Sequence, residues 1–198
     1  MRKIIFATSN EGKMKEIREI LRDLDVDLLS LKEVGLNPDI DENGITFEEN
    51  AIIKAKQVME LTGEIVLADD SGLEVDYLDK APGVYSARFM GEGTSYHIKN
   101  QFILDQLINA KEKERSARFV CAIACAFPDG EVVTRTATIE GSIAKEISNG
   151  GNGFGYDPIF FVEEYGCTTA DMSSEQKNEI SHRGKALKAM KEVVKIHL

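Results

Sequence analysis

The sequence predicts an α/β fold with a mixed β-sheet, and two observations carry the prediction. Short apolar runs such as residues 3–8 and 65–69 suit strands, and stretches with apolar residues at helical spacing separate them. The turn Pro128-Asp129-Gly130 lies between two long apolar segments and predicts a β-hairpin. A hairpin added to strand–helix alternation gives a sheet that is neither purely parallel nor purely antiparallel.

Length and composition bound the class of protein. With 198 residues, 42% of them hydrophobic, the chain is long enough for one domain, which we expect to span residues 1–198. The net charge of -10 argues against binding of a nucleic-acid polymer, because such a binder needs a basic surface. Three cysteines without paired spacing, no signal peptide and no apolar stretch of membrane length predict a soluble cytoplasmic protein that does not contact a membrane.

The first half of the chain begins with a predicted strand at residues 3–8 and a polar turn, after which Lys13 opens a helix. Apolar residues recur at helical spacing in this helix: Met14, Ile17, Ile20, Leu21 and Leu24. A second strand is expected at residues 28–31. The capping box that begins at Thr46 starts another helix, which ends at Gly63.

The second half contains most of the predicted sheet. The apolar strand at residues 65–69 is expected to stop in a polar turn, and an extended segment follows at 73–78. A helix is predicted over 96–110, with four residues packing inward: Ile98, Phe102, Ile103 and Leu107. The strands of the hairpin are expected at 118–127 and 131–143.

The last part of the chain opens with a glycine-rich stretch at residues 149–161. Its glycines permit close approach of the backbone to a ligand, although the stretch also suits a flexible loop with aromatic residues that enter the core. A capping box at Ser173 opens a short helix, which residues 181–184 interrupt. The final helix carries its apolar residues on one side: Ala186, Leu187, Met190, Val193 and Val194.

Two adjacent acids, Asp69 and Asp70, follow the central apolar strand. A buried strand that ends in carboxylates can deliver them to the edge of an α/β sheet, where ligands bind. The same residues also suit an ordinary turn. Since neighbouring residues on a strand point to opposite faces, one acid is expected to be catalytic and the other structural, and the pattern alone leaves open which is which.

The first turn has the features of a phosphate site. A strand, a small polar loop and a helix start follow each other at Thr8–Lys13, and free N–H groups at a helix start favour phosphate. A plain turn between strand and helix is the alternative. Together with the two acids, Lys54, Lys177 and the aromatic glycine loop, this segment supplies the residue types that a metal–triphosphate site needs.

Six motifs, in this order along the chain, make the sequence resemble the inosine triphosphate pyrophosphatase family. They are Thr8-Ser9-Asn10-x-Gly12-Lys13, Thr46-Phe47-x-x-Asn50-Ala51-x-x-Lys54-Ala55, Asp69-Asp70-Ser71-Gly72-Leu73, Pro82-Gly83-x-Tyr85-Ser86-Ala87-Arg88, Phe154-Gly155-Tyr156-Asp157-Pro158 and Ser181-His182-Arg183-Gly184. The resemblance covers essentially the whole chain, and no functional position departs from the family pattern.

The resemblance implies a fold, an activity and a set of roles. The implied fold is an elongated, twisted mixed sheet flanked by helices, in two lobes around a central active-site cleft. The implied reaction is Mg²⁺-dependent hydrolysis of ITP, dITP and XTP to the monophosphate and pyrophosphate, in a homodimer. Glu42 and Asp70 would bind the metal, with Asp70 as the base on water. The residues implied to bind substrate are Thr8, Ser9, Asn10, Glu11, Gly12, Lys13, Lys54, Ser71 and Lys177 on the phosphates, and Phe154, Gly155, Tyr156, Asp157, His182 and Arg183 on the base.

Three other functions remain open from the sequence. A related pyrophosphatase could act on modified pyrimidine triphosphates. A regulatory protein could bind nucleotides without turnover, although retention of Glu42 and Asp70 argues against that reading. A phosphomonoesterase with paired aspartates would release orthophosphate instead of pyrophosphate.

Overall fold

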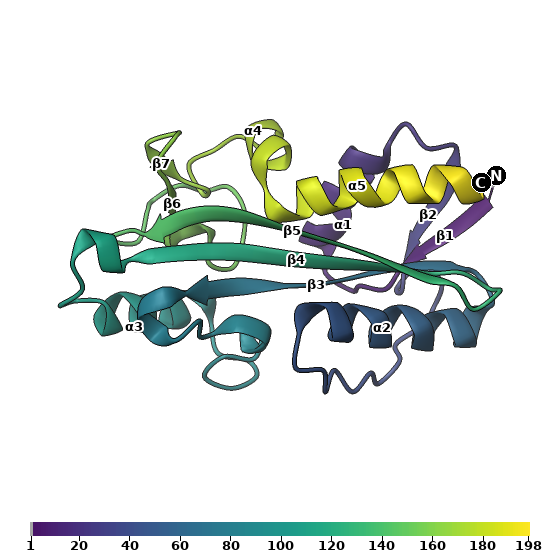
Figure 1. Cartoon of the computed structure of the whole chain (residues 1–198), viewed down its shortest axis with the longest axis horizontal. Helices are drawn as coiled ribbons and strands as arrows, with labels where there is room; N and C mark the ends of the chain where they lie inside the picture. The colour runs from purple at the N-terminus through teal and green to yellow at the C-terminus, as the bar shows by residue number, and fades with distance from the viewer. Residues whose placement is uncertain (1) are drawn as a thin grey trace. The chain divides into compact units, whose positions relative to one another are not determined.

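The computed structural model describes residues 2–198, and the predicted α/β fold with a mixed sheet is confirmed there (Figure 1). The strands are β1 (Arg2–Phe6), β2 (Val26–Ser30), β3 (Ile65–Val75), β4 (Ser116–Ala126), β5 (Val132–Ile143), β6 (Phe160–Val162) and β7 (Cys167–Thr168). The α-helices are α1 (Glu11–Leu21), α2 (Phe47–Thr62), α3 (Tyr96–Gln106), α4 (Ser174–Ile180) and α5 (His182–His197). The strand order in the sheet is β2-β1-β3-β4-β5-β6-β7.

The sheet is mixed because its two ends are built differently. At one end β1 pairs in parallel with both β2 and β3, with Ile4 opposite Leu28 and Ile65. At the other end β6 pairs antiparallel with β5 and with β7. Parallel neighbours need a crossover connection, and α1 and α2 provide these connections between β1, β2 and β3.

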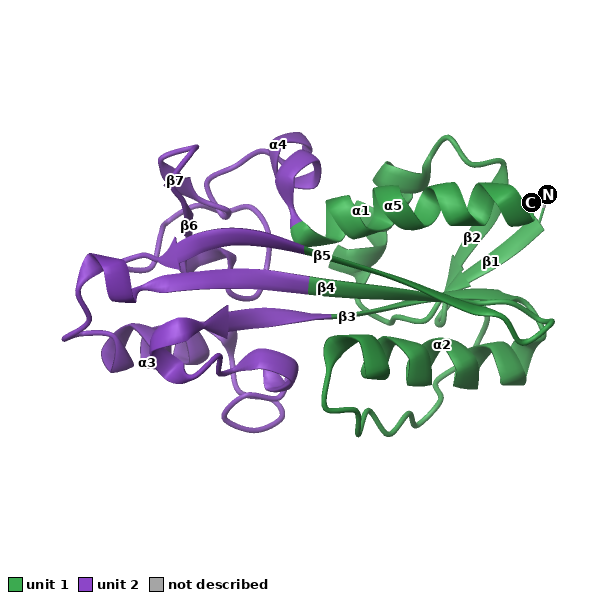
Figure 2. Ribbon diagram, viewed as in Figure 1, with its two compact units in different colours: residues 1–70, 121–137, 182–198 green, residues 71–120, 138–181 purple. Residues whose placement is uncertain are grey.

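The chain divides into two compact units, shown in different colours in Figure 2. Unit 1 comprises residues 1–70, 121–137 and 182–198, and unit 2 comprises residues 71–120 and 138–181. The chain therefore passes from one unit to the other at four positions, and three of these positions lie inside β3, β4 and β5.

The core of unit 1 is formed by β1, β3, β4 and the two helices α1 and α5. Met14 and Ile17 of α1 and Leu187 and Met190 of α5 are buried in the same apolar cluster. The buried side of α5 agrees with the helical spacing of its apolar residues. The helix that begins after Thr46 also forms as predicted, since the Thr46 side chain accepts from the Glu49 N–H and Gly63 takes the left-handed conformation after the last turn.

Near the C-terminus of unit 1, His197 lies between two acceptors. Its Nδ1 lies 2.9 Å from the Val193 carbonyl oxygen and its Nε2 lies 3.2 Å from the Glu131 carboxylate. Only a doubly protonated ring can donate to both. The carbonyl of Val193 and then Glu131 accordingly raise the pKa of His197 above its usual value.

The core of unit 2 contradicts one sequence prediction. In helix α3, Ile103 and Leu107 are buried as expected, but Ile98 is 51% and Phe102 36% exposed, whereas Lys99 and Asn100 are buried. The reason is that these two polar side chains reach backbone carbonyl oxygens, at Ala87 and Gly155 respectively. A buried polar group is tolerated when it is hydrogen-bonded. The spacing of apolar residues alone therefore did not predict that Lys99 and Asn100 lie on the buried side of this helix.

The central strand differs from its prediction as well. It was expected to stop in a polar turn at Asp69 and Asp70, but β3 continues through both acids to Val75. Asp69 is buried inside this strand because cationic side chains from other elements pair with its carboxylate. Such partners come from distant segments and leave no local signal.

None of the helices within residues 2–198 combines the length and the apolar character that a membrane crossing requires.

Candidate active site

The predicted phosphate loop connects β1 to α1 in unit 1. The Asn10 side chain caps the helix, since its oxygen accepts the Lys13 N–H at 3.1 Å, and the Thr8 hydroxyl oxygen accepts the Asn10 N–H at 3.2 Å. These bonds shape the loop and satisfy one of the open N–H groups of the first turn. The remaining loop residues, Ser9, Glu11 and Gly12, are exposed.

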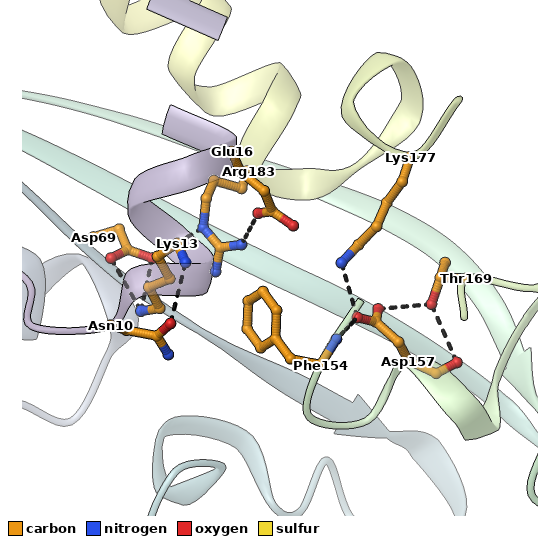
Figure 3. Close-up of polar contacts among 9 residues, drawn as sticks. All are labelled: Asn10, Lys13, Glu16, Asp69, Phe154, Asp157, Thr169, Lys177 and Arg183. Atoms are coloured by element: carbon orange, nitrogen blue, oxygen red, sulfur yellow. Dashed lines mark hydrogen bonds and ion pairs between the residues drawn. The ribbon is translucent and has the colours of Figure 1, made fainter. Parts of the chain in front are cut away.

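Asp69 joins this loop to helix α5. Each oxygen of its carboxylate lies 3.0 Å from the Lys13 ammonium, and Oδ2 also accepts from the Arg183 guanidinium at 3.3 Å. A different nitrogen of Arg183 lies 2.5 Å from the Glu16 carboxylate. Figure 3 shows the Lys13 side chain turned toward Asp69 and that of Arg183 turned toward Glu16. Two acids and two cations therefore balance each other in this cluster.

The charge state of Asp69 follows from this pairing. Its side chain is 1% exposed, and burial alone would raise its pKa. The charges of Lys13, Arg183 and Lys54 outweigh burial, and the pKa of Asp69 lies well below its usual value. Asp69 is therefore a permanently ionised, fully engaged carboxylate, which makes it a poor candidate for accepting a proton.

Asp70 has different surroundings, although it is the next residue. Its Oδ2 accepts from the Asn50 amide at 3.0 Å, and the Asn50 Oδ1 in turn accepts the Gly44 N–H at 2.8 Å. Burial raises the pKa of Asp70, and the Glu42 carboxylate raises it further, against the lowering effect of Lys54 and Asn50. A carboxyl group with a raised pKa accepts a proton more readily than an ordinary one.

Lys54 holds the two acidic segments together. Its ammonium donates to the Asp69 backbone oxygen at 3.0 Å and pairs with the Glu42 carboxylate at 3.1 Å. Asn50 and Lys54 are four residues apart on α2 and therefore lie on the same face of that helix. One helix face thus orients both Asp70 and Glu42.

Glu42 and Asp70 suit a magnesium ion. Within residues 2–198 there is no group of three or more His, Cys, Asp and Glu side chains arranged to hold a metal. Two neighbouring carboxylates are what Mg²⁺ requires when the phosphates of its ligand supply further oxygens, because this ion is rarely held by an all-protein cage. The Glu42 carboxylate raises the pKa of Asp70 through like-charge repulsion, and a divalent cation between the two acids would relieve that repulsion.

A second polar cluster lies in unit 2, around Asp157. One carboxylate oxygen accepts from the Phe154 N–H at 2.7 Å and from the Lys177 ammonium at 2.8 Å, and the other accepts from the Thr169 hydroxyl at 2.7 Å. Figure 3 shows these three groups converging on Asp157. Gly153 is required here, because a Cβ at this position would lie 2.2 Å from the carboxylate and its φ is +76°.

The cluster around Asp157 holds the Phe154 ring and the Lys177 ammonium close to each other. Asp157 and Lys177 are both buried, and the Lys177 ammonium lies 4.9 Å from the centre of the Phe154 ring. The neighbouring Tyr156 points into the core of unit 2, where its hydroxyl donates to the Ser86 backbone oxygen at 2.7 Å. The glycine loop is thus anchored by Asp157 and Tyr156, and Phe154 remains only partly buried.

The other predicted site residues occupy well-defined positions. Ser71 follows Asp70 within β3 and is partly buried, while His182 and Arg183 are buried in the first turn of α5. Sequence reasoning did not assign Asn50, Glu16 and Thr169, which hold Asp70, Arg183 and Asp157 respectively. Only Asn50 had a signal, since it belongs to the motif that contains Lys54.

Comparison with known proteins agrees with the motifs. A model of the Ham1 family matches residues 4–193. The chain is 47% identical to a protein from Clostridium perfringens named dITP/XTP pyrophosphatase, over 98% of each chain. It is 45% identical to a dITP/XTP pyrophosphatase from Bacillus subtilis, again over 98% of each.

Solved structures give the same result. A HAM1 protein from Coxiella burnetii superposes with a TM-score of 0.89 at 42% identity, covering 98% of this chain and 99% of the other. A nucleoside-triphosphatase / dITP/XTP pyrophosphatase from Mycobacterium abscessus superposes with a TM-score of 0.77 at 41% identity, covering 95% and 98%. Since family model, sequence and fold agree over nearly the full length, the chain belongs to the Ham1 family.

Proposed function

We propose that the chain hydrolyses the non-standard purine nucleoside triphosphates dITP, ITP and XTP to the monophosphate and pyrophosphate. Its relatives at 45–47% identity are named dITP/XTP pyrophosphatases, which places it among the hydrolases of phosphoric anhydride bonds. The observation that carries the mechanism is the Glu42–Asp70 carboxylate pair, which Lys54 and Asn50 hold in unit 1 together with the loop that bears Lys13.

Several polar groups suit the triphosphate. In this proposal the loop from Thr8 to Lys13 and the ammonium of Lys54 contact phosphate oxygens, and Ser71 adds a hydroxyl. Lysines act on phosphates as point charges and offset the negative charge that develops on departing pyrophosphate. Lys177, which Asp157 holds in position, is proposed to contact phosphate oxygens as well.

Glu42 and Asp70 are the residues that would hold Mg²⁺. When bound, the ion would offset phosphate charge and make a water molecule more acidic. Asp70 accepts the proton of the water that attacks the α-phosphorus. The position of Asp70 supports this role, because the Asn50 amide holds its Oδ2 and Lys54 holds the Glu42 carboxylate.

The base is recognised through Phe154, His182 and Arg183. The Phe154 ring offers a face for stacking, and Asp157 fixes the backbone N–H of the same residue. Donors from the His182–Arg183 turn suit the 6-oxo group of hypoxanthine or xanthine, which accepts where the 6-amino group of adenine donates. A mismatched donor leaves buried polar groups without partners and can cost an analogue about 10⁴-fold in rate.

A substrate panel tests the proposal. Rates on dITP, ITP, XTP, ATP, GTP and dUTP are measured with and without Mg²⁺, and the phosphorus product is identified by NMR. We expect Mg²⁺-dependent release of pyrophosphate, fastest from dITP, ITP or XTP. Orthophosphate as the first product would indicate a phosphomonoesterase. A preference for dUTP would indicate a pyrimidine enzyme, and binding without turnover would indicate a regulatory protein. Each of these results would refute the proposal.

A further inference from the structure

The motif from Pro82 to Arg88 and the buried face of α3 have no part in the roles proposed above. Both lie in unit 2, and both contact the glycine loop that carries Phe154. Their polar contacts are unusual for a helix and a turn that serve only to fill a core.

Asn100 of α3 holds the backbone of the glycine loop. Its side chain is 2% exposed, and its Nδ2 donates to the Gly155 backbone oxygen at 3.1 Å. Its Oδ1 is buried without a hydrogen-bond partner among residues 2–198. A buried acceptor left in this state opposes folding. The opposite orientation of the amide would face two oxygens toward each other, so the contribution of Asn100 is its donation to Gly155.

Tyr156 provides a second attachment, one residue further on. Its hydroxyl donates to the backbone oxygen of Ser86 at 2.7 Å, and the ring of Tyr96 from α3 packs edge-on against its ring at 5.2 Å. The same Tyr96 ring lies against Gly155, since a Cβ there would come within 3.5 Å of it. The loop is therefore fixed at two consecutive residues.

The motif that receives Tyr156 is itself fixed. The Ser86 hydroxyl accepts the Leu73 N–H from β3 at 2.9 Å and donates to the Gly83 backbone oxygen at 2.6 Å. The next carbonyl along, that of Ala87, accepts from the buried Lys99 ammonium at 2.6 Å. The segment that carries the acceptor of the Tyr156 hydroxyl is thus hydrogen-bonded to strand β3 and to helix α3.

We infer that the Asn100 side chain and the Tyr156 hydroxyl are positioning groups that set Phe154 for stacking on the purine, with the Pro82–Arg88 motif as their support. This inference rests on the proposed function and deepens it. Phe154 directly precedes Gly155, so a shift of the Gly155 carbonyl moves the ring. Two of the proposed phosphate ligands, Lys13 and Lys54, bond to Asp69 and Glu42 and not to this loop. A change in the position of Phe154 should therefore affect binding of the base more than binding of the phosphates by these two lysines.

Two variants test the inference. Asn100→Leu keeps the approximate size of the side chain and removes the donor, and Tyr156→Phe removes only the hydroxyl. Since one hydrogen bond contributes about 0.5–1.5 kcal/mol, we expect the KM for dITP and the Kd for IMP each to rise about two- to twelvefold. We expect kcat and the inhibition constant of pyrophosphate to stay at the wild-type values. Gln101→Ala, at an exposed position of the same helix, is the matched control.

Hydrogen exchange supplies a readout that does not depend on turnover. A peptide covering residues 150–158 should exchange faster in both variants than in the wild type and in Gln101→Ala. An unchanged KM and unchanged exchange in both variants would overturn the inference. So would a loss of kcat and pyrophosphate binding in proportion to the loss of dITP binding, because that pattern indicates a general structural role. Absence of dITP hydrolysis in the wild type would instead refute the proposed function.

Discussion

The two adjacent aspartates of β3 should respond in opposite ways to the same isosteric change. Asp69→Asn removes the acid that faces Lys13 and Arg183, whereas Asp70→Asn removes an acid whose ionised form is disfavoured by burial. Asparagine has nearly the same shape as aspartate. The comparison therefore tests the charge, together with one acceptor oxygen, at two neighbouring positions of one strand.

The expected loss for Asp69→Asn follows from its pairing. Removing one partner of a buried ion pair leaves an uncompensated charge and costs about 3–5 kcal/mol. For a chain of this length each kcal/mol lowers Tm by about 2–4 °C, so the expected decrease is about 6–20 °C. For Asp70→Asn we expect the stability at pH 7 to stay within about 0.5 kcal/mol of wild type or to rise. Turnover should be abolished, with nucleotide binding retained.

The pH dependence gives the sign of each effect. Because the pKa of Asp69 is lower in the folded chain than in the unfolded chain, its stabilising contribution is full above about pH 4 and declines as the pH falls further. The gap between wild type and Asp69→Asn should therefore shrink at acidic pH. Urea unfolding at pH 7 and at pH 3 measures both quantities. Equal stability losses for the two variants, or turnover by Asp70→Asn near the wild-type rate, would refute this reasoning.

Three further predictions concern other parts of the chain. Gly153→Ala should lower the free energy of unfolding by about 1–3 kcal/mol from the positive φ alone. It should also raise the KM for dITP, because the new Cβ displaces Asp157. Wild-type values in thermal unfolding and in kinetics would contradict this prediction. Asp157→Asn should remove the counter-charge of Lys177 and replace one of the two acceptor oxygens with an NH2 donor, with a loss of about 3–5 kcal/mol in urea unfolding. A loss below about 1 kcal/mol would show that the carboxylate is unimportant there. His197→Gln should reduce stability at pH 5.5 and have little effect at pH 8.5. The reason is that the pKa of His197 is raised in the folded chain, so this residue stabilises the fold only while its ring is protonated. A difference in unfolding midpoint that does not depend on pH would count against this prediction.

Features set by neighbouring residues were predictable from sequence. The helix that follows Thr46 and the short helix that follows Ser173 both begin with the predicted side-chain caps, because a capping box depends only on residues three apart. The mixed sheet was predictable too, since the hairpin turn at residues 128–130 is a local signal. The motif resemblance located the family, which the comparisons then confirmed.

Features set by distant partners were not predictable. The continuation of β3 through Asp69 depends on Lys13 and Arg183, which lie 56 and 114 residues away along the chain. The buried polar face of α3 depends on carbonyl acceptors in other loops. The bonds of Asp157 and Tyr156 to Phe154, Lys177 and Ser86 were not foreseen from sequence either, because these partners lie on other segments or on the backbone. The expected contact of Asp157 and Tyr156 with the base stays a prediction.

The four passages of the chain between its two units have a consequence for synthesis on the ribosome. The last segment of unit 2 ends at Ser181, whereas unit 1 still requires residues 182–198. Those residues form α5, whose Leu187 and Met190 belong to the same buried cluster as Met14 and Ile17 of α1. Unit 1 therefore completes its core only after all segments of unit 2 have been made, and α1 waits for its partner until residues 182–198 have been synthesised. A nascent chain stalled before α5 would expose this apolar face of unit 1 and become a target for chaperones and proteases.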